Sequence, residues 1–354
     1  MGPALMFAAA SCVLGGDTQP EGPPPSLHVD VRVETGIQPK SVSAAPDGRH
    51  IAVCNFGQSS RRNVVLLRPD DLTEISSVNF EGTATESRWR SANTLLVSDF
   101  SRGSLRTIDV PTATVVDTVK VGPNPKGIAL SADGTTAFVT NWSGQSVSVV
   151  DLENHTVVDT IKTGRRPRGV AVLEGDVVTV GAMWDHRVEV FAPHGRRWRG
   201  APQIRRVCSY PRDVHTTPDG AWLVFSCSGN RRVRWFDAQT RRFVGQAFVG
   251  ANPRSLSIAS NGQWAAVANF HGSSVSLVDL RNGLATTSDV PDTDGIVGIA
   301  VHPGPAPVVF ATSWRTGEVV RMVPPDAAQW SAATSANASA TLRLRGNPPP
   351  CALD

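Results

Sequence analysis

The sequence predicts an all-β fold made of seven repeated units, each with four antiparallel strands, and three observations support this. One short stretch recurs along the chain, the interval between its copies is nearly constant, and each unit contains short apolar runs separated by turn residues. Self-similarity at a fixed period of about 20–50 residues is typical of repeat architectures. The repeat therefore predicts the overall architecture, and the individual strands are assigned within it.

The recurring stretch is clearest as PNPKGIALSADG at residues 123–134, with versions at 36–48, 164–175, 210–220 and 251–262. Its proline is Pro39, Pro125, Pro167, Pro211 or Pro253, at intervals of 86, 42, 44 and 42 residues. Because the first interval is twice 43, a degenerate copy is expected midway, and TESRWRSANTLLVSDF at 85–100 occupies that place. One further step reaches DGIVGIAVHPGPAPVVFATSW at 294–314, which makes seven units.

The third unit, residues 127–164, shows the internal pattern of every unit. β-branched and apolar runs at 128–130, 136–140, 147–150 and 157–163 alternate with Asp-Gly, Ser-Gly and Glu-Asn turns. Four short strands in about 42 residues are typical of a propeller blade, so we expect a seven-bladed β-propeller with strands A to D running from the channel outwards. Asp47-Gly48, Asp133-Gly134, Asp219-Gly220 and Asn261-Gly262 are the expected A to B turns.

A ring of blades must close, because an unclosed ring exposes strand edges. Residues 26–36 have the pattern of a strand D without their own A to C, so we expect them to complete the seventh blade. The alternative is ATLRLRG at 340–346, which follows an Ala/Ser/Thr-rich stretch and suits the same place or an added outer strand. The predicted organisation is a leader and Pro-rich tether at 1–26, the propeller at 27–326 and a C-terminal tail at 327–354.

The third unit also resembles a known repeat. The run AFVTNWSGQSVSVVDLENHTVVDTIKTGRRPRGVAV is similar to the YVTN repeat of seven-bladed propellers, a family that includes YncE-like periplasmic proteins and surface-layer proteins. FVTN at 138–141 matches the name motif, and IAVCN (51–55) and AAVAN (265–269) are good versions, whereas the other four units depart from it. The resemblance implies a binding or surface module, although related propellers include enzymes such as lactonases.

The charge of the chain does not by itself indicate a partner. A formal net charge of +3 and a pI near 8.7 are too mild to predict a nucleic-acid binder. Residues 194–242, however, hold eleven arginines against three aspartates, which predicts a basic side around blades four and five. That side is either a solvated surface or the contact surface of an anionic partner.

The N-terminus predicts export. Residues 1–16 are apolar and uncharged, and AAASC resembles a poor lipoprotein box that makes Cys12 the candidate lipidated residue. A basic segment before this apolar run is missing. The following DTQPEGPPPS suits a tether, so the expected location is the periplasm, the cell surface or the medium. Four cysteines remain apart from Cys12, and they can form two disulfide pairs or stay as free thiols: Cys54, Cys208, Cys227 and Cys351.

Residues that enter strand A and residues that end strand B converge on one face of a propeller, around the channel mouth. The first set holds Lys40, Lys126, Arg168, Arg212 and Arg254, with Glu86 and Val297 as approximate counterparts. The second set holds Asn55-Phe56, Asp99-Phe100, Asn141-Trp142, Met183-Trp184, Asn269-Phe270 and Ser313-Trp314. A mouth of cations, amides and aromatic rings suits an anionic or planar ligand. The competing interpretation is structural, because each position belongs to the repeat.

Blade five is the best candidate for chemistry. Asp213 and His215 replace small and apolar residues there, and alternate residues of a strand share a side. Cys227 is expected nearby at the end of strand B, where it is either a third catalytic candidate or the disulfide partner of Cys208. The alternative to a catalytic role is a structural hydrogen bond between Asp213 and His215. No metal-ligand spacing, haem motif, nucleophile elbow or phosphate loop is present, so no metal or cofactor is predicted.

Two classes of function follow. The first is an exported, non-enzymatic binding or scaffold propeller for an anionic small molecule or a protein partner, with nucleic acid as a weaker option because Trp142, Trp184 and Phe270 can stack on bases. The second is a propeller enzyme, a lactonase-like hydrolase or an isomerase, with its site near blade five.

Overall fold

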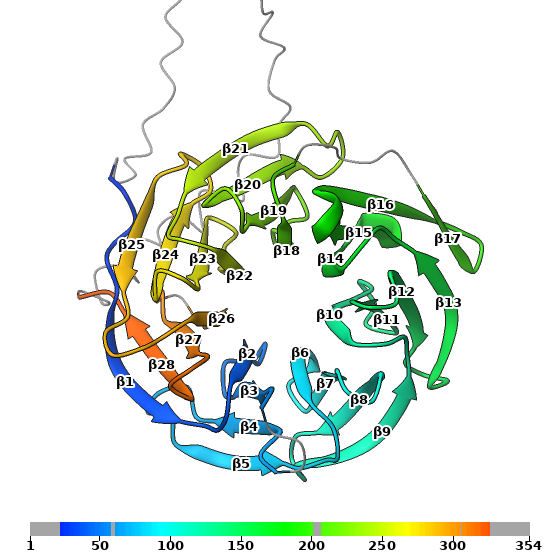
Figure 1. Ribbon diagram of the computed structural model, residues 1–354, viewed down its shortest axis with the longest axis horizontal. Coiled ribbons are helices and arrows are strands. Elements are labelled where there is room, and N and C mark those ends of the chain that lie inside the picture. Colours follow the sequence, from blue (N-terminus) through cyan, green and yellow to red (C-terminus); the bar gives the residue numbers. More distant parts are fainter. Residues whose placement is uncertain (1–21, 58–60, 201–206, 305, 326–354) are drawn as a thin grey trace, which may run out of the picture.

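The computed structural model describes residues 22–57, 61–200, 207–304 and 306–325. They form seven four-stranded antiparallel sheets arranged around a central channel (Figure 1). This arrangement confirms the predicted seven-bladed β-propeller. Its only described helical turns are two short 3₁₀ segments in blade four, η1 (Glu174–Asp176) and η2 (Met183–Asp185).

The strands of each blade run from the channel outwards. The A strands of blades one to seven are β2 (Pro39–Ala44), β6 (Ala84–Ser91), β10 (Pro125–Leu130), β14 (Pro167–Leu173), β18 (Pro211–Thr216), β22 (Pro253–Ile258) and β26 (Ile296–Val301). The B strands are β3 (Ile51–Asn55), β7 (Thr94–Asp99), β11 (Thr136–Asn141), β15 (Val177–Ala182), β19 (Trp222–Cys227), β23 (Trp264–Asn269) and β27 (Val309–Ser313).

The outer half of each blade follows the same order. The C strands are β4 (Val64–Leu67), β8 (Ser104–Asp109), β12 (Ser146–Asp151), β16 (Arg187–His194), β20 (Arg232–Asp237), β24 (Ser274–Asp279) and β28 (Glu318–Val323). The D strands are β5 (Glu74–Val78), β9 (Thr114–Lys120), β13 (Thr156–Lys162), β17 (Arg197–Gly200), β21 (Phe243–Phe248), β25 (Ala285–Asp289) and, for blade seven, β1 (His28–Glu34).

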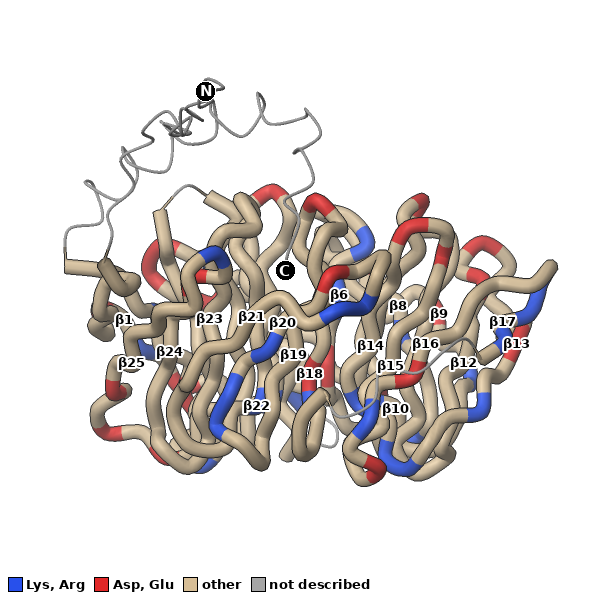
Figure 2. The backbone as a smooth tube through the Cα atoms, turned by 90° about the horizontal axis from the view of Figure 1, so that it is seen from above, with Lys and Arg blue, Asp and Glu red and all other residues tan. Residues whose placement is uncertain are grey.

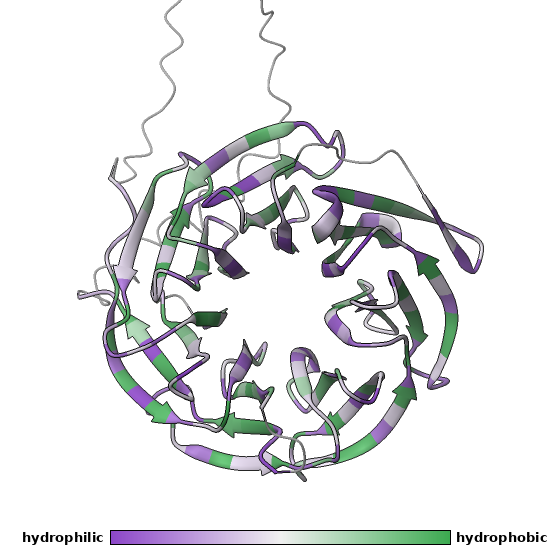
Figure 3. Ribbon diagram, viewed as in Figure 1, coloured by the Kyte–Doolittle hydropathy of each residue, from purple (hydrophilic) through white to green (hydrophobic). Residues whose placement is uncertain are grey.

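The hydrophobic core is divided among the seven interfaces between neighbouring blades. Each of seven buried clusters combines side chains of two adjacent blades, including the pair formed by blades seven and one. Apolar residues run along the strands, and hydrophilic residues mark the turns (Figure 3). Because each sheet buries both faces against its neighbours, the B strands are almost continuously apolar rather than alternating.

The Asp-Gly turns connect strands A and B as expected. Gly48, Gly134, Gly220 and Gly262 have φ values of 69–72°, and the preceding Asp or Asn accepts the N–H two residues ahead. These turns lie on one face of the disc, which we call the turn face. The loops that enter strand A lie on the opposite face, the entry face. Figure 2 shows the disc from the side, with acidic residues in turns along its edge.

The N-terminal strand closes the ring. β1 pairs antiparallel with β28 from His28↔Val323 to Glu34↔Glu318, and Arg321 donates to Asp30 across this junction at 2.5 Å. Both ends of the propeller therefore meet in blade seven. The alternative closing segment at 340–346, the candidate lipid site Cys12 and Cys351 lie outside the described residues. No helix of the described part is long and apolar enough to cross a membrane.

Candidate functional site in the central channel

A β-bulge positions the basic residues that the sequence singles out. In blades one, three, four, five and six the residue after the entry proline falls where the register between strands A and B shifts. The shift inserts an extra residue on strand A, which turns that residue away from the regular ladder. We call these five residues the cation ring: Lys40, Lys126, Arg168, Arg212 and Arg254.

The register corrects the position assigned to blade two. Ala84 pairs with Asp99 as Pro39 pairs with Asn55, so Thr85 occupies the level of the cation ring. Glu86 lies one residue further along and matches Asp213, because both backbone N–H groups donate to a serine of strand B. Blade seven has Val297 at the ring level, as expected. The ring is thus five cations interrupted by a buried threonine and a buried valine.

Aromatic side chains lie against three of the five cations of the ring. Lys126 Nζ lies 5.0 Å from the centre of the Phe100 ring and 4.6 Å from that of Trp142. The guanidinium carbon of Arg254 lies 3.2 Å from the centre of Phe270, and Lys40 Nζ lies 5.6 Å from Trp314. Cations over aromatic faces gain electrostatic attraction. The aromatic residues after strand B therefore contact the ring cations directly.

The entry loops fix those aromatic residues through the backbone. Trp142 N–H donates to the carbonyl of Asn124, and Phe270 N–H donates to the carbonyl of Asn252. Asn124 and Asn252 precede the entry prolines and have φ of 54° and 56°. Asparagine tolerates this left-handed conformation better than most residues. The same turn thus places both a cation and its aromatic partner.

The ring carries more positive charge than its surroundings neutralise. Burial and the neighbouring guanidinium of Arg168 hold the pKa of both Lys40 and Lys126 well below the ordinary value. Burial, with Arg168 and Arg254 nearby, also lowers the pKa of Arg212, and burial followed by Arg168 lowers that of Arg254 to about 9. Like charges in a buried space disfavour one another, so the site favours an added anion.

One carboxylate reaches the ring from across the channel. Glu86 of blade two accepts a hydrogen bond from Arg168 of blade four at 3.2 Å. Blade three lies between these two blades in the ring (Figure 1). Glu86 therefore provides an internal counter-charge for one of the five cations, and the other four make no ion pair with any residue that the structure describes.

The predicted amides make internal hydrogen bonds rather than facing the mouth. Asn55, Asn141 and Asn269 are fully buried. Asn141 donates to Ser146 and Ser148, Asn269 donates to the equivalent Ser274 and Ser276, and Asn55 donates to backbone carbonyls. Asn141 and Asn269 tie the end of strand B to strand C of the same blade, and Asn55 ties it to the loops at Thr35 and Arg62, which is the structural interpretation of these positions.

Trp184 lies on the entry face away from the ring lysines. It is 46% exposed, and Arg166 is placed between Trp184 and Trp142, at 5.0 and 5.3 Å from the two ring centres. This stack is more accessible than the ring. It forms a cation–aromatic surface beside the mouth, and Trp142 joins this surface to Lys126 of the ring.

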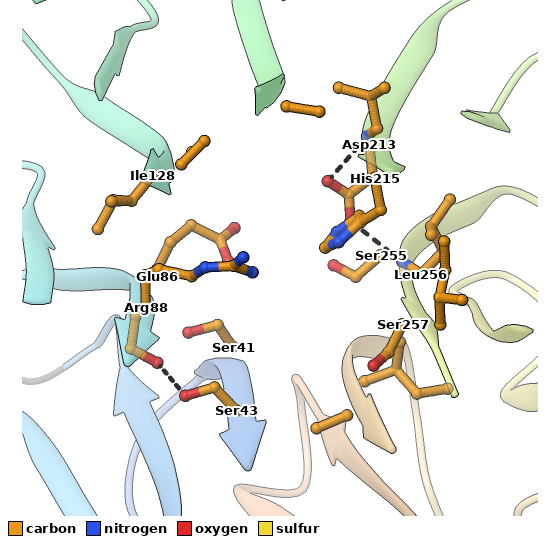
Figure 4. Close-up of a pocket in the computed structure, with 18 of the residues that line it drawn as sticks. Ser41, Ser43, Glu86, Arg88, Ile128, Asp213, His215, Ser255, Leu256 and Ser257 are labelled. Carbon is orange, nitrogen blue, oxygen red and sulfur yellow. Dashed lines mark hydrogen bonds and ion pairs between the residues drawn. The ribbon is translucent and has the colours of Figure 1, made fainter. Parts of the chain in front are cut away.

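The candidate residues of blade five divide into two pairs. His215 Nε2 lies 3.4 Å from Asp213 Oδ2, and both side chains face the channel (Figure 4). Burial opposes ionisation of Asp213, but His215, Arg168 and the Leu256 N–H together hold its pKa below the ordinary value. Cys227 is fully buried and is joined to Cys208 in a disulfide, with Cα atoms 5.6 Å apart. A disulfide-bonded Cys227 has no thiol to act as a nucleophile.

A cavity of about 570 Å³ occupies the channel next to the ring. It is lined by all seven A strands and extends from Glu86 and Arg168 to Pro46 and Pro218 near the A to B turns. It lies on the turn-face side of the ring. Arg88, which sequence analysis did not single out, projects into it from β6 (Figure 4). The signal for Arg88 was its place two residues after Glu86, since alternate residues of a strand share a side.

Fold and channel together define this protein as a seven-bladed β-propeller with a basic central channel. Residues 31–177 match the family model of YNCE-like β-propellers, which confirms the resemblance read from the repeats. A search of curated proteins finds no match. Among solved structures, hydrazine synthase of Kuenenia stuttgartiensis is similar, with a TM-score of 0.70 and 17% sequence identity over 83% of this chain and 98% of that chain. At this identity the likeness shows the fold alone.

Proposed function

We propose that the protein is an exported, non-enzymatic binding propeller that holds an anionic ligand at the cation ring. The observation that carries the proposal is the set of buried donors without partners. Lys40 Nζ and one N–H group each of Arg168, Arg212 and Arg254 have no hydrogen-bond partner among the described residues. Buried donors are normally paired, so unpaired charged donors at one level of the channel indicate a place for acceptor oxygens.

The burial of the ring favours a small ligand. Lys40 and Arg168 are only 5% and 4% exposed, and a polymer cannot bring its backbone against such groups without a wide opening. Phosphate, sulfate and carboxylate groups match the donors of Arg and Lys. Nucleic acid would instead meet the more exposed Arg166 and Trp184 first. An anionic segment of a protein partner is a further candidate with the same chemistry.

The disulfide supports the export part of the proposal. Disulfides persist in oxidising compartments such as the periplasm and the cell exterior, and they are rare in reducing cytosol. The Cys208–Cys227 bridge agrees with the apolar N-terminal segment in pointing to an exported protein.

The test of the ring is a titration with pyrophosphate at constant ionic strength, in which calorimetry measures the binding affinity. We expect Lys126→Gln to weaken binding about tenfold, because one charge-assisted contact is lost. Lys162→Gln is the matched control, since Lys162 is exposed at the outer end of β13 and its loss changes the net charge equally. We expect it to bind within about twofold of the parent.

Equal affinities for the two folded variants would exclude the ring as the binding site. A short single-stranded oligonucleotide in the same assay separates the alternatives. If it binds while phosphate, pyrophosphate, sulfate and citrate do not, nucleic acid replaces the small anion as the ligand.

A second candidate function rests on the Asp213–His215 contact in the cavity. A carboxylate that orients an imidazole is the arrangement of a general base, which a lactonase-like hydrolase or an isomerase requires. A screen of lactones for hydrolysis, repeated with His215→Gln, tests it. Turnover by the parent that the variant lacks would establish the enzyme, and no turnover of any lactone would exclude the hydrolase.

A further inference from the structure

The channel cavity differs from the cation ring in its chemistry. Its volume of about 570 Å³ lies within the range of small-molecule sites, roughly 300–1,000 Å³. Its lining includes Arg168 but not Lys40, Lys126, Arg212 or Arg254. A ligand in the cavity therefore meets a different set of side chains from one bound on the entry face.

Two blades on opposite sides of the cavity carry the same acid-x-base pattern. Blade two has Glu86-Ser87-Arg88 and blade five has Asp213-Val214-His215, at matching register. The other five blades have only small residues at these two levels, namely Ser41 and Ser43, Gly127 and Ala129, Gly169 and Ala171, Ser255 and Ser257, and Gly298 and Ala300. At these two levels the cavity thus has charged side chains on two walls only, and Arg168 of blade four adds a third charged wall at the level of the ring.

Both carboxylates of this pattern already have partners. Glu86 accepts from Arg168, while Asp213 accepts from the backbone N–H groups of Val214 and Leu256 at 3.1 and 3.0 Å and contacts His215. Arg88 makes no hydrogen bond or close ion pair with any described residue and is exposed within the channel, where burial lowers its pKa and the charge of Asp213 only partly offsets this. The charge available to a ligand in the cavity is therefore positive.

The blade opposite Arg88 provides hydrogen-bonding groups for a neutral polar substituent. His215 Nε2 lies 3.4 Å from Asp213 Oδ2, and a neutral imidazole that turns its Nε2–H toward this carboxylate keeps Nδ1 as an acceptor. Ser255 lines the same cavity, and its hydroxyl has no partner among the described residues. An acceptor and a hydroxyl on one wall match a hydroxyl group of a ligand.

We propose that the cavity is a second binding site, and that it takes a small hydroxycarboxylate. Arg88 binds the carboxylate with two parallel N–H donors, while His215 and Ser255 bind the hydroxyl from the opposite wall. Asp213 is a positioning residue that fixes the orientation of the imidazole. The site is reached from the turn face and does not depend on anion binding at the cation ring.

The test compares L-malate with succinate, which differ by one hydroxyl, by calorimetry at constant ionic strength. We expect the parent to bind malate about tenfold more tightly than succinate. Arg88→Gln should weaken malate binding about tenfold or more. Arg90→Gln is the matched control, because Arg90 lies two residues further along the same strand and its guanidinium donates to the Gly134 carbonyl instead. Its malate affinity should stay within about twofold of the parent.

Two further measurements separate the parts of the proposal. His215→Gln should reduce the preference for malate over succinate while retaining binding of both, whereas pyrophosphate bound at the cation ring should leave that preference unchanged. Failure of the cation ring to bind pyrophosphate therefore leaves this inference standing. Equal malate affinity in folded Arg88→Gln and Arg90→Gln proteins would overturn it, as would equal affinity of the parent for malate and succinate or no binding of malate.

Discussion

Lys40 adds a positive charge to the channel, and burial of that charge lowers the stability of the fold. Its ammonium group is buried beside Trp314 without a hydrogen-bond partner among the described residues, and four cations share its level. A buried charge of this kind opposes folding unless an anion accompanies it. The side chain is better explained by ligand binding than by stability.

Replacing Lys40 by Met should therefore stabilise the protein and weaken anion binding. Methionine keeps the length of the side chain and removes the desolvated charge, so we expect the free energy of unfolding to rise by about 1–3 kcal/mol at pH 7. Chemical denaturation measures this change, and the pyrophosphate titration of the same variant measures the loss of affinity. Lower stability of the variant at neutral pH would contradict a functional role for the charge.

The same comparison has a defined pH dependence. Burial, followed by the charge of Arg168, lowers the pKa of Lys40 in the folded state, so the unfolded chain binds the extra proton between that pKa and the ordinary value. Stability of the parent then rises with pH over this window, and the advantage of the methionine variant shrinks as pH approaches about 10. An advantage that is constant from pH 7 to pH 10 would show that packing, not charge, causes it.

At the scale of elements, the disulfide fastens the entry of blade five. Cys208 precedes β18 and Cys227 ends β19, which brings together two segments that both reach the entry face. The bridge closes a loop with a sequence separation of 19 residues. It therefore restrains the loop that positions Arg212 in the cation ring.

Removing the bridge should lower stability without unfolding the ring. For the Cys208→Ala and Cys227→Ala double variant we expect a loss of about 3 kcal/mol, because a loop of this size gains freedom in the unfolded chain. Chemical denaturation of oxidised parent and variant measures the loss. Thiol labelling of the unreduced, unfolded parent provides the control, since labelling of Cys208 and Cys227 there would show that the bridge does not form.

The elements also show how far the sequence alone leads. The entry proline marks five blades, and the period of the repeat predicts the other two, because turns and spacing can be read along the chain. Blade two has no entry proline to mark the bulge that sets the register between strands A and B, so Glu86 was assigned to the ring level that Thr85 occupies. The same limit hid Arg88, whose importance depends on the partners that Glu86 and Asp213 find in other blades. Burial of Asn55, Asn141 and Asn269 likewise follows only from three-dimensional packing.

The whole molecule depends on one junction. Blade seven is completed by β1, whose Val31 and Val33 pack against the hydrophobic cluster shared by blades seven and one. Every other blade is formed from one continuous segment. Closing the ring with β1 therefore gives blade seven its outer strand, so β28 has no unpaired edge.

A chain that begins at Gly36 tests this junction. Without β1, β28 presents an unpaired edge and part of one core cluster loses its cover, so we expect aggregation or a large fall in the melting temperature. A chain that begins at Leu27 is the control, because it retains β1 and lacks only the preceding segment. Equal melting temperatures for the two chains would show that another segment closes the ring.

The same junction also joins the first strand of the propeller to be synthesised with one of the last. Asp30 and Arg321, which bond across it, are 291 positions apart in the chain. At a synthesis rate of roughly 5–20 residues per second, β1 waits about 15–60 s for its partner strand to be made. If each blade folds as it is made, the early blades form an open arc with a free strand at one end during that interval. The alternation of charged and apolar residues in HVDVRVE, with its acids and its arginine, keeps that waiting strand soluble until the last blade arrives.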